Sequence, residues 1–129
     1  MIDHVGYLVR DLDAAVERVT RELATEVTHP VDRPQWSLFG YYVGQVEVFT
    51  FTDPQLLDER LGGADDVLDH IAWQVDDIAA AMARFPEAHW TGPDLCETVT
   101  EAFDLGTAKH IWTISEGLGL QLIEHARPV

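Results

Sequence analysis

The chain contains one sequence pattern twice, and this repeat constrains its architecture more than any other feature. Residues 2–19 read IDHVGYLVRDLDAAVERV, and residues 68–85 read LDHIAWQVDDIAAAMARF. Aligned without a gap, the two segments are identical at Asp3/Asp69, His4/His70, Val9/Val75, Asp11/Asp77, Ala14/Ala80, Ala15/Ala81 and Arg18/Arg84. Such a repeat indicates two copies of one supersecondary unit. It places a histidine at the same point of two equivalent strands, so His4 and His70 are a candidate metal-binding pair.

The length of the chain fits one domain built from two half-size modules. It has 129 residues, of which 47% are hydrophobic, enough to bury a shared core. We predict a first module at residues 1–53, a connector at 54–66 and a second module at 67–129. The start of the connector (PQLLDERL) is a candidate short helix that ends at Gly62-Gly63.

The charge and the cysteine content limit the possible partners and the compartment. A net charge of −15 argues against nucleic acid and against anionic membranes, and it favours neutral or cationic small molecules. Cys96 is the single cysteine, no apolar run is long enough to span a bilayer, and the N-terminus does not have the pattern of a signal peptide. These features predict a cytoplasmic protein.

Hydrophobic periodicity predicts a βαβββ order in each module. In the first module we expect strands at 2–9, 36–43 and 45–52, with a helix from Leu12 that is capped by Asp11. Residues 25–34 are less regular because Pro30 and Pro34 interrupt them. The second module repeats this order with strands at 67–75, 109–115 and 119–125, and with a helix at 78–85 that Pro86 stops. One further strand is expected within 87–108. The fold class is therefore α+β.

A charged residue lies among aromatic residues in one predicted strand. Alternation places Glu47, Phe49 and Phe51 on one face, and a buried carboxylate is costly unless it is paired or bound to metal. Aligning residues 44–51 with 118–125 matches Glu47 with Gln121. His4, Glu47, His70 and Gln121 are thus polar residues at matched positions of the two modules.

The chain resembles the vicinal oxygen chelate superfamily, the glyoxalase/bleomycin-resistance/dioxygenase fold. The segments that carry the resemblance are IDHVGYLVRDLDAAV, GQVEVFTFTDP, LDHIAWQVDDIAAAM and GLGLQLIEH. Their order is most similar to glyoxalase I and methylmalonyl-CoA epimerase. The resemblance implies a curved mixed sheet around a metal and substrate cleft, and often a homodimer. It also implies one divalent metal bound by His4, Glu47, His70 and Gln121. This donor set suits Mn, Fe, Co, Ni or Zn.

The implied function is that of a metal-dependent isomerase, epimerase or lyase. It would act on a small oxygenated substrate through a metal-stabilised, enolate-like intermediate. The resembling isomerases usually carry a glutamate where this chain has Gln121, and an amide cannot act as a general base. The proton-transfer candidates are therefore Glu47, Glu26 and His29. If the last strand carries a bulge, Glu124 replaces Gln121 as the ligand.

Several residues have both a functional and a structural interpretation. Candidate pocket residues are Trp36, Tyr42, Trp73, His110 and Trp112, although aromatic residues on strands commonly belong to the core. Two other functions stay open. The two histidines with Glu47 also suit a non-haem Fe(II) oxygenase. The acidic charge and the aromatic residues also suit a non-catalytic, drug-binding protein like those of the bleomycin-resistance branch.

Overall fold

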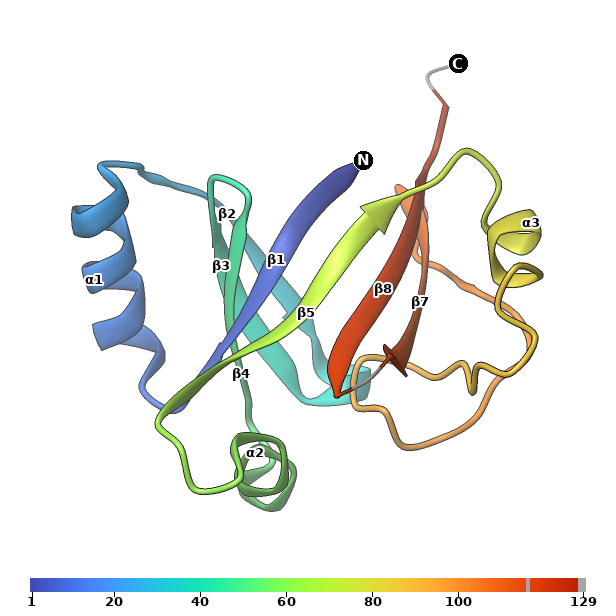
Figure 1. Cartoon of the computed structure of the whole chain (residues 1–129). Coiled ribbons are helices and arrows are strands. Elements are labelled where there is room, and N and C mark those ends of the chain that lie inside the picture. The colour runs from blue at the N-terminus through green and yellow to red at the C-terminus, as the bar shows by residue number, and fades with distance from the viewer. Residues whose placement is uncertain (116, 128–129) are drawn as a thin grey trace. The chain divides into compact units, whose positions relative to one another are not determined.

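The computed structural model describes residues 1–115 and 117–127, which form eight strands, three α-helices and one short 3₁₀ helix (Figure 1). The fold is mixed α+β, as predicted. The chain divides into two compact units, one at His4–Asp69 and one that joins Met1–Asp3 to the second module from His70 onward. The connector therefore belongs with the first unit, and the start of the chain belongs with the second.

The first module has the predicted βαβββ order, followed by a helix in the connector. Its elements are β1 (Ile2–Val9), α1 (Leu12–Leu23), β2 (Val27–Arg33), η1 (Pro34–Trp36), β3 (Leu38–Val43), β4 (Val46–Phe51) and α2 (Pro54–Leu61). The strands are ordered β2-β3-β4-β1, with β1 parallel to β4 and the other pairs antiparallel. β2 forms where the sequence looks irregular. Its Pro30 is tolerated because β2 lies at the end of this order, where a missing N–H costs no ladder bond.

The second module repeats this topology with a shorter helix and a shorter edge strand. Its elements are β5 (Asp66–Gln74), α3 (Ile78–Met82), β6 (Phe103–Asp104), β7 (Ala108–Ser115) and β8 (Leu118–His125). The strands are ordered β5-β8-β7-β6, again with a parallel pair between the first and last strands, β5 and β8. α3 ends at Met82 rather than at the predicted Phe85. Pro86 disfavours a helical conformation at the residue before it, so the chain leaves the helix through tight turns.

Matched capping residues start the main helix of each module. Asp11 accepts a hydrogen bond from the Ala14 N–H at 3.1 Å, and Asp77 accepts one from the Ala80 N–H at 3.0 Å. Each carboxylate satisfies a helix N–H that has no partner within the helix. The duplicated aspartates are therefore explained by helix capping.

The two faces of the first module's strands have separate cores. On one face, Val48 of β4 packs with Val19 of α1. On the other face, Phe49 and Phe51 pack with Leu57 and Leu61 of α2. Glu47 shares this second face by alternation, as predicted.

The second module buries one face of its strands in the same way. Ile111 of β7 and Leu122 of β8 pack with Ile78 and Ala81 of α3. Gln121 and Ile123 alternate to the opposite face. None of the described helices combines the length and the apolar character needed to cross a bilayer.

Candidate metal site

Strand register places the candidate ligands at equivalent points of the two modules. In the first module, Glu47 of β4 lies opposite Gly6, two residues after His4 on β1. In the second, Gln121 of β8 lies opposite Ala72, two residues after His70 on β5. Because side chains alternate along a strand, each histidine shares a face with the polar residue of its neighbouring strand. Each module therefore presents one histidine and one oxygen donor on the same face of a parallel strand pair.

In the first module, His4 and Glu47 are buried side by side. Their exposed fractions are 1% and 7%, and the His4 Nε2 to Glu47 Oε1 distance is 3.9 Å. This distance is too long for a hydrogen bond. Burial of a carboxylate among aromatic side chains requires compensation by a positive charge or by polar partners. The pair places two side chains of metal-ligating type next to each other on one face of the strands.

Two further aromatic side chains line the first-module pair. Tyr42 lies opposite Glu47 on β3, and its hydroxyl is 3.4 Å from each ring nitrogen of His4. The rings of His4 and Tyr42 meet edge to face at a centroid distance of 5.2 Å. His29, on the edge strand β2, stacks on Tyr42 with centroids 4.6 Å apart. The predicted bases of the first module outside the ligand set are Glu26 and His29. Of these, His29 contacts Tyr42, which in turn contacts His4.

In the second module, His70 and Gln121 are each 3% exposed. The amide nitrogen of Gln121 contacts His110 Nδ1 at 2.7 Å. The amide oxygen of Gln121 is buried and, among the described residues, has no hydrogen-bond partner. A buried carbonyl oxygen without a partner is costly, so this atom is suited to an unrecorded polar or cationic partner.

The alternative ligand, Glu124, lies on the opposite face of β8. Its Oε1 accepts a hydrogen bond from the Ile78 N–H at 2.8 Å, at the start of α3. Its Oε2 lies 4.0 Å from Lys109 Nζ. The strand carries no bulge between Gln121 and Glu124, since the register with β7 is continuous. Glu124 therefore supports the start of α3. Gln121 lies on the other face of β8, together with Ile123.

Two of the proposed pocket residues line the face of Gln121. His110 and Trp112 lie at alternate positions of β7, and Trp112 is directly opposite Gln121. Their rings are nearly parallel, with an interplanar angle of 10° and a centroid distance of 5.7 Å. Phe103 of β6 lies opposite His110 and contacts Trp112.

The other two pocket assignments, Trp73 and Trp36, have different outcomes. Trp73 alternates with His70 on β5 and shares the face of Val75, which packs on the α3 core, so it lies on the opposite face from His70. Its side chain is 45% exposed. Trp36 is half-buried and packs against the core that contains Phe51, on the face that Glu47 shares, so its pocket role stays a prediction.

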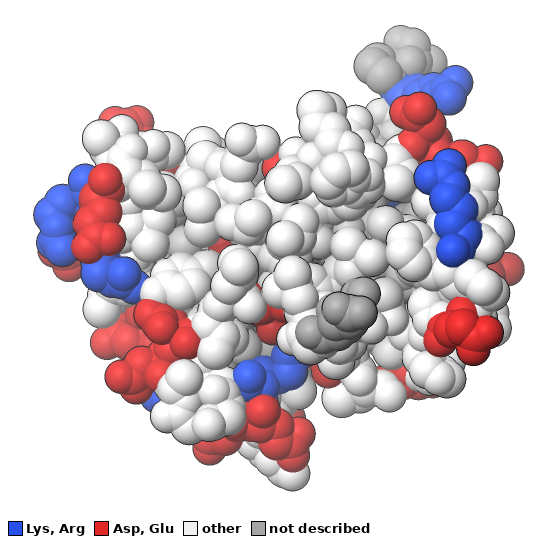
Figure 2. Space-filling view, viewed as in Figure 1, with Lys and Arg blue, Asp and Glu red and all other residues white. Residues whose placement is uncertain are grey.

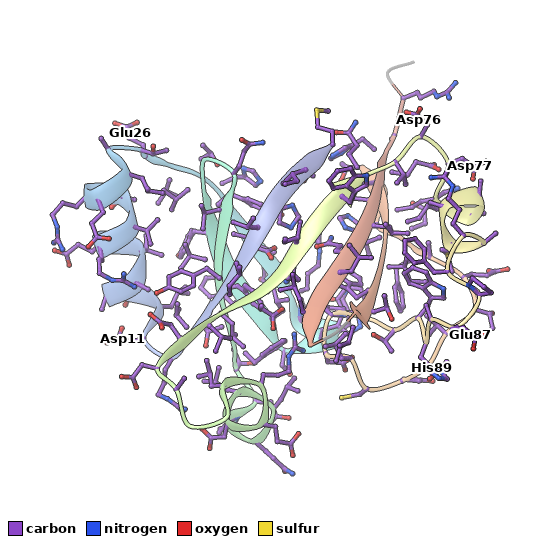
Figure 3. All side chains as sticks on the ribbon, in the orientation of Figure 1. Asp11, Glu26, Asp76, Asp77, Glu87 and His89 are labelled. Atoms are coloured by element: carbon purple, nitrogen blue, oxygen red, sulfur yellow. The ribbon has the colours of Figure 1, made fainter. Side chains whose placement is uncertain are left out.

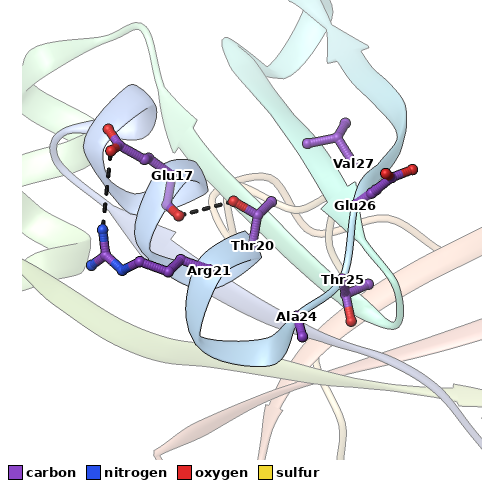
Figure 4. A pocket seen from close by; sticks show the side chains of 7 residues that line it. All are labelled: Glu17, Thr20, Arg21, Ala24, Thr25, Glu26 and Val27. Carbon is purple, nitrogen blue, oxygen red and sulfur yellow. Dashed lines mark hydrogen bonds and ion pairs between the residues drawn. The ribbon is translucent and has the colours of Figure 1, made fainter.

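Glu26 lies away from His4 and Glu47. It follows the C-terminal end of α1 (Figure 3) and is exposed. It lines a groove with residues of α1, including Glu17 and Arg21, whose side chains are 4.0 Å apart (Figure 4). The structure therefore does not bring Glu26 to the candidate site. The bulge between Val27 and His29 changes the alternation there, which the sequence does not reveal.

The aspartates beside the two histidines have side-chain hydrogen-bond partners of their own. Asp3 Oδ2 lies 2.6 Å from His125 Nε2, and Asp69 Oδ1 lies 2.5 Å from an Arg60 guanidinium nitrogen. Both aspartates precede a candidate ligand and alternate to the other face of the strand. These contacts therefore involve the strand faces opposite the candidate ligands.

Comparison with solved structures identifies the fold. The methylmalonyl-CoA epimerase of Mycobacterium tuberculosis matches with a TM-score of 0.79 at 17% identity, covering 98% of this chain and 88% of that one. The chain has the vicinal oxygen chelate fold. A second methylmalonyl-CoA epimerase matches with a TM-score of 0.75 at 21% identity, covering 98% and 95% of the two chains. A hypothetical protein from Bacillus halodurans matches with a TM-score of 0.70 at 13% identity, covering 100% and 96%. No protein-family model matches the sequence, and no curated protein matches it significantly.

Proposed function

We propose that the protein is a metal-dependent epimerase or isomerase of the vicinal oxygen chelate fold. Its divalent ion would be held by His4 and Glu47 from the first module and by His70 and Gln121 from the second. The observation that carries the proposal is the matched register, because it gives both modules a buried histidine and an oxygen donor in the same relation. Burial of His4, Glu47 and His70, all residues that ligate metals, supports it.

The donor atoms fit a divalent transition metal. Metal–nitrogen and metal–oxygen bonds of about 2.0–2.2 Å allow two ligands of one ion to lie up to about 4.3 Å apart. The 3.9 Å separation between His4 Nε2 and Glu47 Oε1 is within this limit. The amide oxygen of Gln121 is buried without a hydrogen-bond partner in the described chain, as expected of a ligand oxygen. Two imidazoles with oxygen donors suit Mn, Fe, Co, Ni or Zn.

A bound ion would polarise a substrate carbonyl and stabilise negative charge that develops beside it. The residues of the chain would orient the substrate and move its proton. Glu47 is the carboxylate of the ligand set and can accept a proton if its bond to the ion is loose. His29 is the second candidate base, because its ring stacks on Tyr42 next to His4. Glu26 is no longer a candidate base, because it lies beside α1.

We propose a small oxygenated substrate with an acidic carbon–hydrogen bond. The epimerases with the same fold act on methylmalonyl-CoA, yet this chain has only eight Lys and Arg residues against 23 Asp and Glu. In the first module, basic side chains lie beside acidic ones: Arg10 with Asp58, Arg18 with Glu22 and Arg21 with Glu17. Figure 2 shows red and blue side chains intermingled over α1. Such a surface favours the acyl part of a thioester over the phosphates of coenzyme A.

The test is exchange of the substrate's acidic proton with deuterium from the solvent. Metal-loaded protein is incubated in D₂O with methylmalonyl-CoA or with the methylmalonyl thioester of N-acetylcysteamine, which lacks phosphates, and exchange is followed by NMR. We expect exchange above the protein-free rate that is abolished by a chelator and by Glu47→Gln, and that does not require the phosphates. Exchange at the protein-free rate with both thioesters would contradict an epimerase of this class.

A second function rests on the three-residue subset His4, Glu47 and His70. Two histidines and one carboxylate also suit non-haem Fe(II). Oxygen consumption by the Fe(II)-loaded protein, without deuterium exchange, would favour an oxygenase. Absence of any bound metal, with tight binding of a basic aromatic compound, would favour a drug-binding protein. A homodimer and a cytoplasmic location remain predictions from the sequence.

A further inference from the structure

We infer that His110 is a positioning residue that fixes the side-chain amide of Gln121 with its oxygen available as a metal ligand. This inference rests on the proposed function and assigns a role to a residue outside the ligand set. It follows from the contact between the two side chains, from the packing of the His110 ring and from a difference between the modules.

The contact defines which atom of each side chain donates. The Gln121 amide nitrogen lies 2.7 Å from His110 Nδ1. An amide nitrogen can only donate, so Nδ1 must accept, and the neutral His110 ring carries its proton on Nε2. This hydrogen bond engages the amide nitrogen and leaves the amide oxygen unused. The oxygen is buried and has no hydrogen-bond partner in the described chain.

The His110 ring is itself held in place. It lies almost parallel to the ring of Trp112, at 10°, and Trp112 is only 7% exposed. Across the strand pair, Phe103 lies opposite His110 and contacts Trp112. Because these neighbours restrict the ring, Nδ1 is presented to Gln121 at a fixed point on the face of β8.

The two modules differ at the position of His110. The chemistry of their candidate ligands explains this difference. His110 lies opposite Ile123 on β8, and the equivalent position in the first module is Gly40, opposite Phe49 on β4. A carboxylate such as Glu47 offers two equivalent oxygens, so either orientation can bind a metal. An amide offers one oxygen and one NH₂ group, so a reversed Gln121 would present hydrogen atoms in place of a ligand. At this position, the module with the amide ligand carries a side chain that can select the amide's orientation, and the other module carries a glycine.

Two substitutions separate the hydrogen bond from the volume of the side chain. His110→Phe keeps an aromatic ring beside Trp112 and removes the acceptor. His110→Asn provides an amide oxygen close to the place of Nδ1 and keeps an acceptor. The matched control is His89→Phe, because His89 is exposed on the loop after α3 (Figure 3). Circular dichroism and thermal melting confirm that each variant is folded.

The first measurement is the dissociation constant for Co²⁺, obtained by competition with a chelator, together with the visible absorption of the bound ion. Loss of a group that orients a ligand typically weakens metal binding by about 10- to 100-fold. We expect His110→Phe to show that loss and an altered Co²⁺ spectrum. We expect His110→Asn to stay within about threefold of wild type, and His89→Phe to match wild type. Wild-type affinity in His110→Phe, or equal weakening in both His110 variants, would overturn the inference.

The second measurement distinguishes failure of this inference from failure of the metal site. In metal-free protein, the ¹⁵N shifts of the His110 ring report which nitrogen carries the proton. We expect an unprotonated Nδ1, and a change in the Gln121 side-chain amide signals in His110→Phe. A proton on Nδ1 would overturn the role of His110 even if the wild type binds metal. A wild type that binds no divalent ion would overturn the proposed function, and this inference with it.

Discussion

The two modules share one backbone plan but support their candidate ligands differently. In the first, the face that carries Glu47 continues into the core of Phe49 and Phe51 against α2. In the second, the equivalent face carries His110 and Trp112 beside Gln121. The candidate ligand of the first module thus borders core packing, and that of the second is hydrogen-bonded to His110. The register of the candidate ligands is the same in both modules, while their surroundings differ.

The helix-covered faces differ as well. Tyr7 of β1 and Trp73 of β5 occupy equivalent positions in the repeat. Tyr7 is half-buried beside α1, where its hydroxyl is hydrogen-bonded to Asp66 and to the Arg18 guanidinium. Trp73 is 45% exposed. α1 has 12 residues and α3 has five, so the residue that corresponds to Arg18, Arg84, falls beyond the end of α3. Helix length therefore decides how well each position is covered.

The largest expected effect tests the packing of the first module. An alanine Cβ at Gly40 would lie 2.2 Å from the Val48 carbonyl oxygen and 2.7 Å from Phe49 Cβ. We expect Gly40→Ala to lower the free energy of unfolding by about 3 kcal/mol, at the upper end of overpacking. His110→Ala, at the equivalent position, should cost about 1 kcal/mol from one lost hydrogen bond. Urea unfolding measures both, and equal losses would remove the proposed difference between the modules.

The next prediction exchanges the two oxygen ligands. Glu47→Gln removes the only carboxylate of the proposed set and should weaken divalent metal binding by about 100-fold, which corresponds to about 2.8 kcal/mol at about 1.4 kcal/mol per tenfold. Adding Gln121→Glu should restore affinity to within about tenfold, because the register is equivalent. Chelator competition measures this, with Glu87→Gln on the surface as the control. No rescue in the double variant would show that the two positions are not interchangeable.

A smaller effect is expected at the two helix starts. α1 is capped by Asp11, while α3 has both Asp77 and Glu124 as side-chain acceptors. We expect Asp11→Ala to cost about 1 kcal/mol of unfolding free energy and Asp77→Ala about half as much. Asp11→Asn keeps the acceptor and should behave like wild type in the same urea experiment. A larger loss for Asp77→Ala would mean that Glu124 does not share the capping role.

The smallest effect concerns Tyr7. Its burial, and then its hydrogen bond to Asp66, raise the pKa of the Tyr7 hydroxyl above its ordinary value, against an opposing contribution from Arg18. The folded state therefore favours the neutral phenol. The associated stability is present below the ordinary tyrosine pKa of about 10 and is lost as the pH rises through the higher folded value. Absorbance titration should show a late ionisation that disappears in Tyr7→Phe. An unchanged titration in that variant would contradict this environment.

Residue patterns within single elements were sufficient to predict much of the fold. β1 and α1 have the predicted bounds, because Asp11 marks the helix start and the apolar spacing continues to Leu23. β2 was harder to predict, since a strand that contains Pro30 is stable only at an edge, and the position of a strand in a sheet depends on distant residues.

Features of the candidate site that depend on distant contacts were not predictable in the same way. The repeat was sufficient to predict that Glu47 and Gln121 occupy equivalent positions in the two modules. By contrast, Trp73 is exposed although it is a large apolar residue on a strand, and Glu26 lies beside α1, before β2 begins. The contact between His110 and Gln121 joins side chains diagonally across two strands, so it requires the register of β7 with β8.

We propose that the two modules together hold one divalent ion. Metal content is the most direct test, measured by elemental analysis in the wild type and in His4→Ala and His70→Ala, one variant in each module. The account predicts about one ion per chain in the wild type and loss of that ion in both variants. A wild type without metal after incubation with Mn, Co, Ni, Zn or anaerobic Fe(II), or a variant that keeps its ion, would contradict it.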